Sequence, residues 1–408
     1  MRSVVVCATL AAALLPWRAN AQSLSLTEAD ALARLSVESP RVRAIRAGTD
    51  VVRAEALSAS RWPNPRLTVD RESVAGVTEY LTMVAQPLPI TGRRRLEMQA
   101  ASALVDASAT RADDVIRRAR ADLRVAFAQL VAAQAREQQL TAARDRLREL
   151  ADILAKREAA GDAAGFDRLR AEREVSDVEA DVLSAATDRA RAQAAIAGFF
   201  ADTSDASRIV AAPGPAAATG ELPAVQALVE RALAARGELL ALQKEAAAAR
   251  LSADAAARRR IPEPEVLAGT KSSTAGAGDI GSVFTVQATI PLFDRGKPER
   301  AVAEARAKQA DAQADLLRLT LRSEIAALRA EVAGRREAAA RYRAGATGGA
   351  AEIERVARVS YDAGERSILE LLDAYRTGST ARTRQAALDL AARQAEIELE
   401  FASGWEIR

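Results

Sequence analysis

Hydrophobic positions follow two rhythms along this chain, and each rhythm predicts a different kind of element. In the segment SVFTVQATI (282–290), Phe284, Val286, Ala288 and Ile290 fall on one face and mostly polar side chains on the other. A period of two is typical of a β-strand with one apolar side, although a half-buried hairpin of any soluble protein has the same pattern. The alternation and its flanking prolines predict two strand pairs, at about 66–72 with 79–87 and about 265–272 with 282–290.

A seven-residue rhythm follows the first strand pair. Between Arg93 and Glu158 the sequence contains neither proline nor glycine, and a helix over this stretch would be about 100 Å long. Large apolar residues recur seven positions apart, with one shift of three residues: Ile116, Leu123 and Leu130, then Leu140, Leu147 and Leu154. This spacing predicts coiled-coil-like packing whose winding changes locally at the shift.

A second long helix is expected from Lys297 to about Asp362. Its apolar seam consists of Leu321, Ile325, Leu328 and Val332, and glycines at 334, 345 and 348–349 predict a less regular helix. Both long helices end at a glycine, Gly161 and Gly364, and new helices follow at about 166–198 and 367–402. A glycine at a helix C-terminus before another helix predicts a tight reversal, so each half should contain a long helical hairpin.

These landmarks occur twice in the same order, which indicates a tandem duplication. The prolines, the glycines after the strands and the glycines at the helix reversals recur about 200 residues apart. We therefore divide the chain into a first repeat (22–200), a linker (201–222) and a second repeat (223–408). The linker is assigned from the segment APGPAAATGELP, which is rich in proline, alanine and glycine.

The N-terminus has the features of a secretory signal peptide. Arg2 precedes an apolar run from Val4 to Leu15, and Ala19-Asn20-Ala21 predicts cleavage before Gln22, which makes 1–21 the signal peptide. The single cysteine, Cys7, lies inside the apolar run and follows valines, so lipidation is not expected. The mature chain would contain no cysteine, and the sequence contains no histidine.

This composition narrows the function. Without cysteine and histidine we expect no disulfide, no thiolate or imidazole catalysis, no metal site and no cofactor, and we interpret the protein as a non-enzyme. Carboxylate-only catalysis is the remaining enzymatic alternative. The net charge of +3 is spread over 28% charged residues, which does not favour nucleic acid as a partner. No mature segment reaches 18 consecutive apolar residues, which argues against a transmembrane helix and leaves outer-membrane strands as an alternative.

Four segments carry a resemblance to a known family. They are RWPNPRLTV before the first strand pair, QPLPITGRRR and IPLFDRGKPER after the strands, and YDAGERSILELLDAY (361–375) at the second reversal. Together they resemble the TolC-like outer-membrane factors, most closely the branch paired with heavy-metal or related RND pumps. The resemblance implies a mainly α fold with a small β part. It also implies a homotrimer in which twelve strands form an outer-membrane β-barrel continuous with a periplasmic α-helical barrel.

The resemblance also implies roles for residues near the helix reversals. Asp167, Tyr361 and Arg366 would form a latch between neighbouring helical hairpins that keeps the periplasmic entrance closed. Glu370 and Asp373 would form a carboxylate ring in the pore, and Gly161 and Gly364 would mark the tips where an adaptor docks. An ordinary surface ion pair and a solvated helix face are the alternative interpretations of the latch and the ring.

A repeated junction joins each strand pair to its long helix. Prolines end the strands, glycines allow the bend, and cations begin the helices: Pro87, Gly92, Arg93, Arg94 and Arg95, then Pro291, Gly296 and Lys297. Cations at a helix N-terminus oppose the helix dipole. At the periplasmic face of an outer membrane they would find a partner in anionic headgroups.

The predicted function is therefore an outer-membrane exit duct that passively conducts substrates in a tripartite efflux system. Its expected partners are two further copies of the chain, a periplasmic adaptor, an inner-membrane RND-type transporter and outer-membrane lipid. A periplasmic adaptor and a structural coiled-coil envelope protein are the alternatives. The duplicated unit argues against the adaptor, and the strand pairs argue against a purely coiled-coil protein.

Overall fold

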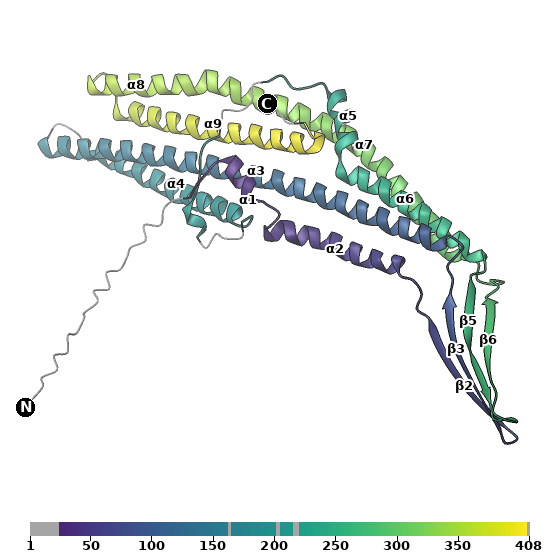
Figure 1. Cartoon of the computed structure of the whole chain (residues 1–408). Coiled ribbons are helices and arrows are strands. Elements are labelled where there is room, and N and C mark those ends of the chain that lie inside the picture. Colours follow the sequence, from purple (N-terminus) through teal and green to yellow (C-terminus); the bar gives the residue numbers. More distant parts are fainter. Residues whose placement is uncertain (1–23, 162–164, 201–204, 215–219, 406–408) are drawn as a thin grey trace, which may run out of the picture.

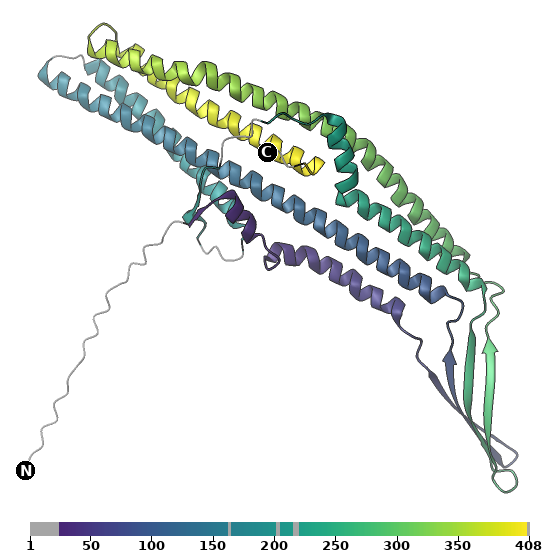
Figure 2. The same ribbon diagram turned by 45° about the horizontal axis from the view of Figure 1, so that its top comes forward.

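The chain forms an elongated bundle of long helices with a small sheet at one end. A computed structural model describes residues 24–161, 165–200, 205–214 and 220–405 (Figure 1). The expected signal peptide, with Cys7, lies outside the described residues. The sheet occupies one end, both helix reversals occupy the other, and the C-terminus lies near the middle (Figure 2). The prediction of a mainly α fold with a small β part is confirmed.

The first repeat contains the longest helix. In chain order it consists of β1 (Leu24–Leu26), α1 (Glu28–Arg34), α2 (Pro40–Ser60), β2 (Arg66–Val74), β3 (Val77–Pro87), α3 (Arg93–Ala160) and α4 (Gly165–Ala197).

The second repeat follows the same order but divides its long helix. After the 3₁₀ turn η1 (Ala206–Arg208) and β4 (Ile209–Ala211) come α5 (Val225–Ala235), α6 (Gly237–Ala257), the 3₁₀ turn η2 (Arg258–Arg260), β5 (Pro264–Ser273), β6 (Ile280–Ala288), α7 (Lys297–Tyr342), the π-helical turn η3 (Arg343–Thr347), α8 (Gly348–Asp362) and α9 (Ile368–Ser403).

The two hairpins join into one antiparallel sheet with the strand order β2-β3-β5-β6. β6 begins and ends two residues earlier than the predicted 282–290, whereas the other strands lie within two residues of their predicted bounds. Gly269 permits the close pairing of β3 with β5, because a Cβ there would overlap the carbonyl oxygen of Thr82. The strand pairs that are separate in sequence are therefore continuous in space.

The register gives the sheet two unlike faces. One face aligns Leu67, Val84, Ala268 and Phe284 in a row, and Leu67 and Phe284 are 66% and 72% exposed. The opposite face carries charged pairs, in which Lys271 lies 2.7 Å from Glu79 and Arg66 lies 3.2 Å from Glu265. One side is thus largely apolar and exposed, whereas the other combines these charged pairs with Leu81 and the buried Met83 and Ala85.

The seven-residue rhythm of α3 marks its buried seam. Leu123 and Leu130 are buried in a cluster with α1 and the end of α4, and Leu147 and Leu154 are buried near the reversals. On α7, Leu321, Ile325 and Val332 are fully buried. The predicted seams are confirmed. No helix in the described part of the chain is both long and apolar enough to cross a membrane.

The second long helix is irregular at some of the predicted glycines. α7 continues through Gly334 without a break, and the π-helical turn η3 then separates α7 from α8 around Gly345. A π-helical turn widens the helix by one residue and weakens its hydrogen-bond ladder. The predicted irregularity is confirmed at Gly345 and wrong at Gly334. A single glycine costs a long helix about 1 kcal/mol, and the packing of α7 against its neighbours is enough to keep the helix continuous there.

The first repeat is tied to the linker and to the second repeat near the middle of the bundle. β1 pairs in parallel with β4, and Gln134 of α3 accepts a hydrogen bond from the Ala211 N–H and donates one to its carbonyl. The Glu28 carboxylate accepts hydrogen bonds from Arg124 of α3 and Arg393 of α9. Burial acts to raise the pKa of Glu28, but the two guanidinium groups outweigh it and hold the pKa below its ordinary value.

Candidate functional site

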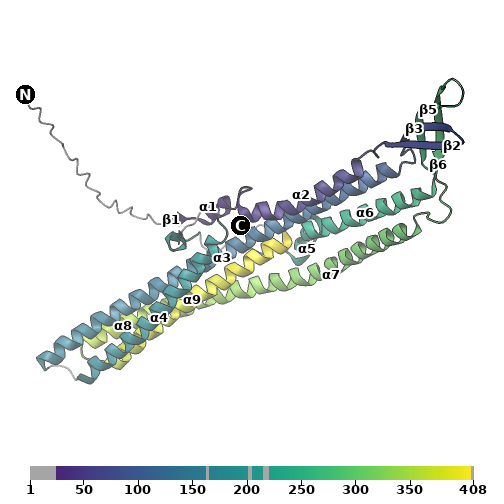
Figure 3. The same ribbon diagram turned by 90° about the horizontal axis from the view of Figure 1, so that it is seen from below.

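The candidate site is the end of the bundle at which both helical hairpins reverse. Figure 3 shows the α3–α4 and α8–α9 ends side by side, and the other views agree. They share one apolar core with residues from four helices: Leu147, Leu150 and Leu154 of α3, Ala171 of α4, Ala357 of α8, and Ile368, Leu371, Leu372 and Ala374 of α9. The two tips are therefore packed against each other through a common set of buried side chains.

Glycine makes each reversal possible. Gly161 has a φ of 83° and Gly364 a φ of 76°, a left-handed conformation in which other residues are strained. The N–H of Gly161 bonds the carbonyls that end α3. After Gly364, Ser367 caps α9 in a capping box with Glu370. These glycines lie where the sequence predicts reversals.

The predicted latch residues lie at this end but do not all contact one another within one chain. Arg366 pairs with Glu370 at 3.1 Å, four residues along its own segment. Tyr361 is half-buried in the shared core, and burial together with the nearby negative charge of Asp167 raises the pKa of its hydroxyl. The structure thus brings Tyr361 near Asp167, whereas Arg366 is paired within its own segment.

Arg157 is a latch-region residue that the sequence analysis missed. Its guanidinium carbon lies 5.7 Å from the centre of the Tyr361 ring, which links the end of α3 to α8. The only signal in the sequence is its place one turn before Gly161. At the first tip Glu158 occupies the position of Tyr361 and pairs with Arg168 of α4 at 2.5 Å. The two tips therefore use different contacts.

The two predicted ring carboxylates have unequal surroundings. Both line an open groove of about 670 Å³ beside the second tip, together with Arg366 and the apolar side chains of Ile353, Val356 and Leu369. Glu370 accepts hydrogen bonds from Arg366 and from the Ser367 N–H. Asp373 is exposed, and within the described residues its carboxylate has no hydrogen bond or ion pair. Asp373 is thus the carboxylate that remains available to an ion.

A buried carboxylate above the second tip was also missed. Glu354 of α8 is 8% exposed and receives Arg146 of α3 at 3.0 Å and Arg382 of α9 at 2.8 Å. It reaches them because α9 has Gly378 at this level: a Cβ on Gly378 would occupy the position of the Glu354 carboxylate. A glycine inside the otherwise helix-favouring sequence of α9 was the available signal.

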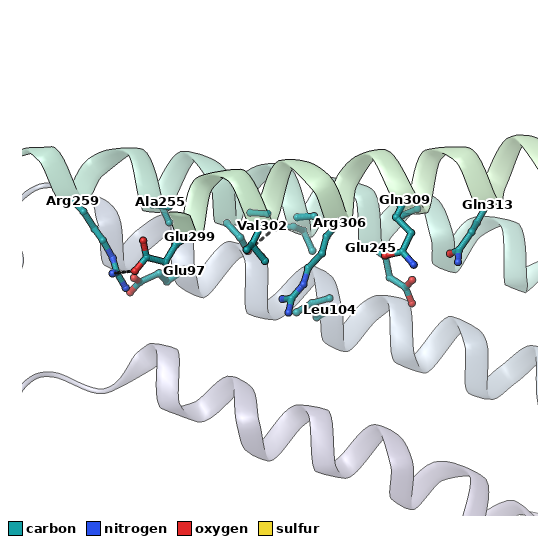
Figure 4. A pocket seen from close by; sticks show the side chains of 16 residues that line it. Glu97, Leu104, Glu245, Ala255, Arg259, Glu299, Val302, Arg306, Gln309 and Gln313 are labelled. Atoms are coloured by element: carbon teal, nitrogen blue, oxygen red, sulfur yellow. Dashed lines mark hydrogen bonds and ion pairs between the residues drawn. The ribbon is translucent and has the colours of Figure 1, made fainter. Parts of the chain in front are cut away.

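The opposite end of the bundle has a second groove, of about 620 Å³, between α3, α6 and α7. Figure 4 shows Arg259 paired with Glu299, and Arg306 extending towards Leu104 of α3. Arg306 has no ion-pair partner among the residues that the structure describes. The lining combines alanines with charges of both signs. Across the described residues no cluster of three or more acidic, histidine or cysteine side chains is placed to hold a metal ion.

The junction residues turn partly inward, which changes their interpretation. Arg93 pairs with Glu263 at 2.9 Å, and Thr91 bonds the same carboxylate. Arg94 stacks over Trp62 at 5.4 Å and bonds the carbonyls at the end of α2. Their charges thus have partners within the chain. Arg95 is exposed and, within the described part, unpaired.

Comparison with known proteins finds a family similarity in the second repeat. Residues 228–405 match the family model described as outer membrane efflux protein. Over these residues the chain is similar to outer membrane efflux proteins. The matched residues 228–405 of this chain include Tyr361, Gly364, Arg366, Glu370 and Asp373. Asp167 lies outside the match, in the first repeat. No curated protein is similar enough to count as a match.

Solved structures extend the likeness to the whole fold. A membrane protein from Pseudomonas aeruginosa is 20% identical, with a TM-score of 0.76 and coverage of 92% of this chain and 93% of that one. The outer membrane protein VceC from Vibrio cholerae is 17% identical (TM-score 0.74, 93% and 97% covered). The Campylobacter jejuni CmeC outer membrane channel is 13% identical (TM-score 0.74, 99% and 94% covered). The TolC-like fold is thus shared by both repeats, and the nearly equal scores single out no branch.

Proposed function

We propose that three copies of this chain form an outer-membrane exit duct of an efflux system. Substrate would pass through it passively from an inner-membrane RND-type pump and a periplasmic adaptor to the exterior. The supporting comparison is the match of residues 228–405 to the efflux protein family together with the fold likeness over both repeats.

One observation carries the proposal: a sheet with two unpaired edges continues directly into long helices. β2 and β6 each pair on one side only. Unpaired strand edges are not tolerated in lipid, so the edges must be joined by other copies. Three copies of four strands give a closed sheet of twelve, with the exposed apolar face outward and the charged face inward.

Cysteine cross-linking between β2 and β6 tests this assembly. Each variant would carry two new cysteines, one at Thr68 and one at a single position within 281–287. The only natural cysteine of the chain is Cys7. Within one chain these strands are three spacings apart, about 14 Å, which exceeds the roughly 7 Å that a disulfide can bridge. A covalent trimer on a non-reducing gel is expected. Monomer for every pair would refute the trimeric sheet.

The latch role is tested by channel conductance. The double variant Tyr361→Phe with Arg366→Ser should raise single-channel conductance in planar bilayers, because contacts that narrow the entrance are removed. Arg341→Ser on α7, which removes an exposed i,i+4 pair away from the tip, is the matched control. Unchanged conductance in the double variant would exclude the latch.

The ring role is assigned mainly to Asp373. Exposed carboxylates repeated around a pore attract cations and bind divalent ions most strongly. Asp373→Ala should weaken block of the current by divalent cations, and Glu370→Ala should do so less, because Glu370 is already paired with Arg366. Equal block in wild type and Asp373→Ala would rule out a ring at this position.

A further inference from the structure

The junction between sheet and helices collects cations that have no partner in the chain. We define the basic belt as the exposed residues Arg61, Arg95, Arg258, Arg260, Arg295 and Lys297, and within the described residues none of them forms an ion pair or a side-chain hydrogen bond. Four nearby carboxylates are already engaged. Glu263 binds Arg93, Glu265 binds Arg66, Glu299 binds Arg259, and Asp294 accepts from the Gly296 N–H.

Tertiary contacts place the belt at one level of the molecule. Arg94 bonds Ser60 and Arg61, so the start of α3 lies against the end of α2. Glu263 joins the start of α3 to the segment that follows η2. Gly296 packs so closely on the end of α6 that a Cβ would overlap the Ala256 carbonyl. The cations thus come from four segments that meet where the sheet begins.

A second observation is independent of charge: the same level exposes large apolar side chains. The apolar belt consists of Trp62 (54%), Ile90 (71%), Ile261 (38%), Ile290 (69%), Leu292 (62%) and Phe293 (99%). It follows directly on the apolar face of the sheet, where Phe284 and Val286 are also exposed. A soluble surface does not favour a fully exposed phenylalanine beside this many aliphatic side chains.

We propose that the two belts bind an anionic phospholipid surface, with the apolar belt among the acyl chains and the basic belt at the phosphates. Aromatic and cationic side chains at this depth anchor proteins in the membrane interface. Arginines hydrogen-bond phosphate oxygens in a bidentate manner. The inference deepens the proposed function by naming the lipid that holds the duct at its periplasmic rim. It also transfers this role from Arg93 and Arg94 to the unpaired cations.

Vesicles of two compositions test the inference with the full mature chain. One set contains phosphatidylcholine alone and the other contains phosphatidylglycerol in addition. Each cation near an anionic surface contributes about fivefold to membrane affinity, and salt screens the effect. Wild-type protein should therefore bind the anionic vesicles at least about tenfold more strongly in flotation, and high salt should abolish the difference.

The decisive variant replaces Arg95, Arg258, Arg260 and Lys297 with glutamine. It should lose the lipid preference while retaining binding to neutral vesicles. Its control makes the same charge change on exposed helical arginines: Arg173, Arg191, Arg341 and Arg355 to glutamine. The control should keep the preference. Phe293→Ser should weaken binding to both vesicle types by a similar factor, because it removes apolar anchoring.

Three outcomes would overturn the inference. In the first, the belt variant prefers anionic vesicles as strongly as wild type does. In the second, the control variant loses this lipid preference as completely as the belt variant does. In the third, the belt variant changes the ion selectivity of the channel but keeps the lipid preference. The last result would place the cations inside the tube. Channel recordings separate this inference from the proposed function. Wild-type channels that form equally well in both lipids refute only the belt, whereas channels in neither lipid refute the duct.

Discussion

The two helical hairpins have the same order of elements, but the long helix of the first is continuous and that of the second is divided. The first is continuous, since α3 runs unbroken from Arg93 to Ala160. Its tip is joined by a partly exposed pair between Glu158 and Arg168. The second is divided by the π-helical turn η3 and held above its tip by the buried Glu354. We call the continuous first hairpin the support and the divided second hairpin the jointed arm. The jointed arm carries the tip residues that match the efflux protein family.

Replacing Gly378 with alanine should have the largest effect on this difference. The new methyl group would displace the Glu354 carboxylate from Arg146 and Arg382, at a cost of about 1–3 kcal/mol in the free energy of unfolding. Hydrogen exchange should accelerate in α8 and α9 and remain unchanged in the sheet-proximal half of α3.

Gly334→Ala provides the matched control for that change. Gly334 lies inside α7 with open space around its Cβ position, so alanine there should stabilise the helix by about 0.5–1 kcal/mol. Equal destabilisation by both substitutions would mean that the Glu354 contact is not the reason for Gly378.

Glu354→Gln should weaken the arm by a somewhat smaller amount. The amide keeps the volume of the carboxylate but leaves two guanidinium groups without their counter-charge, which costs about 1–2 kcal/mol because Arg146 and Arg382 remain partly solvated. Chemical denaturation measures the loss. If Glu354→Gln unfolds at the same denaturant concentration as wild type, the charge of Glu354 is not needed for the stability of the second hairpin.

Acid should loosen the attachment between the two repeats. The pKa of Glu28 is lower in the folded chain than its ordinary value of 4.5, so its contribution to stability is complete above that value and is lost as the pH falls through the lower folded pKa. Thermal unfolding followed from neutral to acidic pH should show a smaller decline in Glu28→Gln than in wild type. Parallel pH profiles would contradict this role.

The first tip should be the least sensitive region. Glu158 and Arg168 are 35% and 29% exposed, and solvent-screened pairs of this kind contribute little to stability. Glu158→Gln should therefore leave thermal unfolding nearly unchanged. A loss of stability as large as that caused by Glu354→Gln would contradict the difference we draw between the two hairpins.

The sequence predicted features that depend on periodicity and on backbone conformation. The seven-residue spacing identified Leu123 and Leu147 as buried, and the need for positive φ identified Gly161 and Gly364 as reversals. Such features are local, because hydrophobic spacing and the lack of a Cβ act within one element.

The features that were missed depend on contacts between distant segments. Glu354 meets Arg146 across 208 positions, and Arg93 meets Glu263 across 170. Many exposed glutamates have similar sequence surroundings, so nothing local distinguishes a buried carboxylate from a solvated one. For the same reason the sequence assigned a lipid-binding role to Arg93 and Arg94, which we now propose for the unpaired cations instead. The partner of Arg93 comes from the other repeat and the partners of Arg94 come from the end of α2.

The pairing of β3 with β5 has a consequence for the timing of assembly. It joins residues such as Met83 and Gly269, which lie in different repeats. An isolated two-stranded hairpin is marginal in water, and long-range strand pairing is slow compared with helix formation. We therefore expect the helical hairpins to form before the sheet. The apolar sheet would then be completed only after the second repeat has emerged, so the edge of β3 stays unpaired from the time the first repeat forms until β5 arrives.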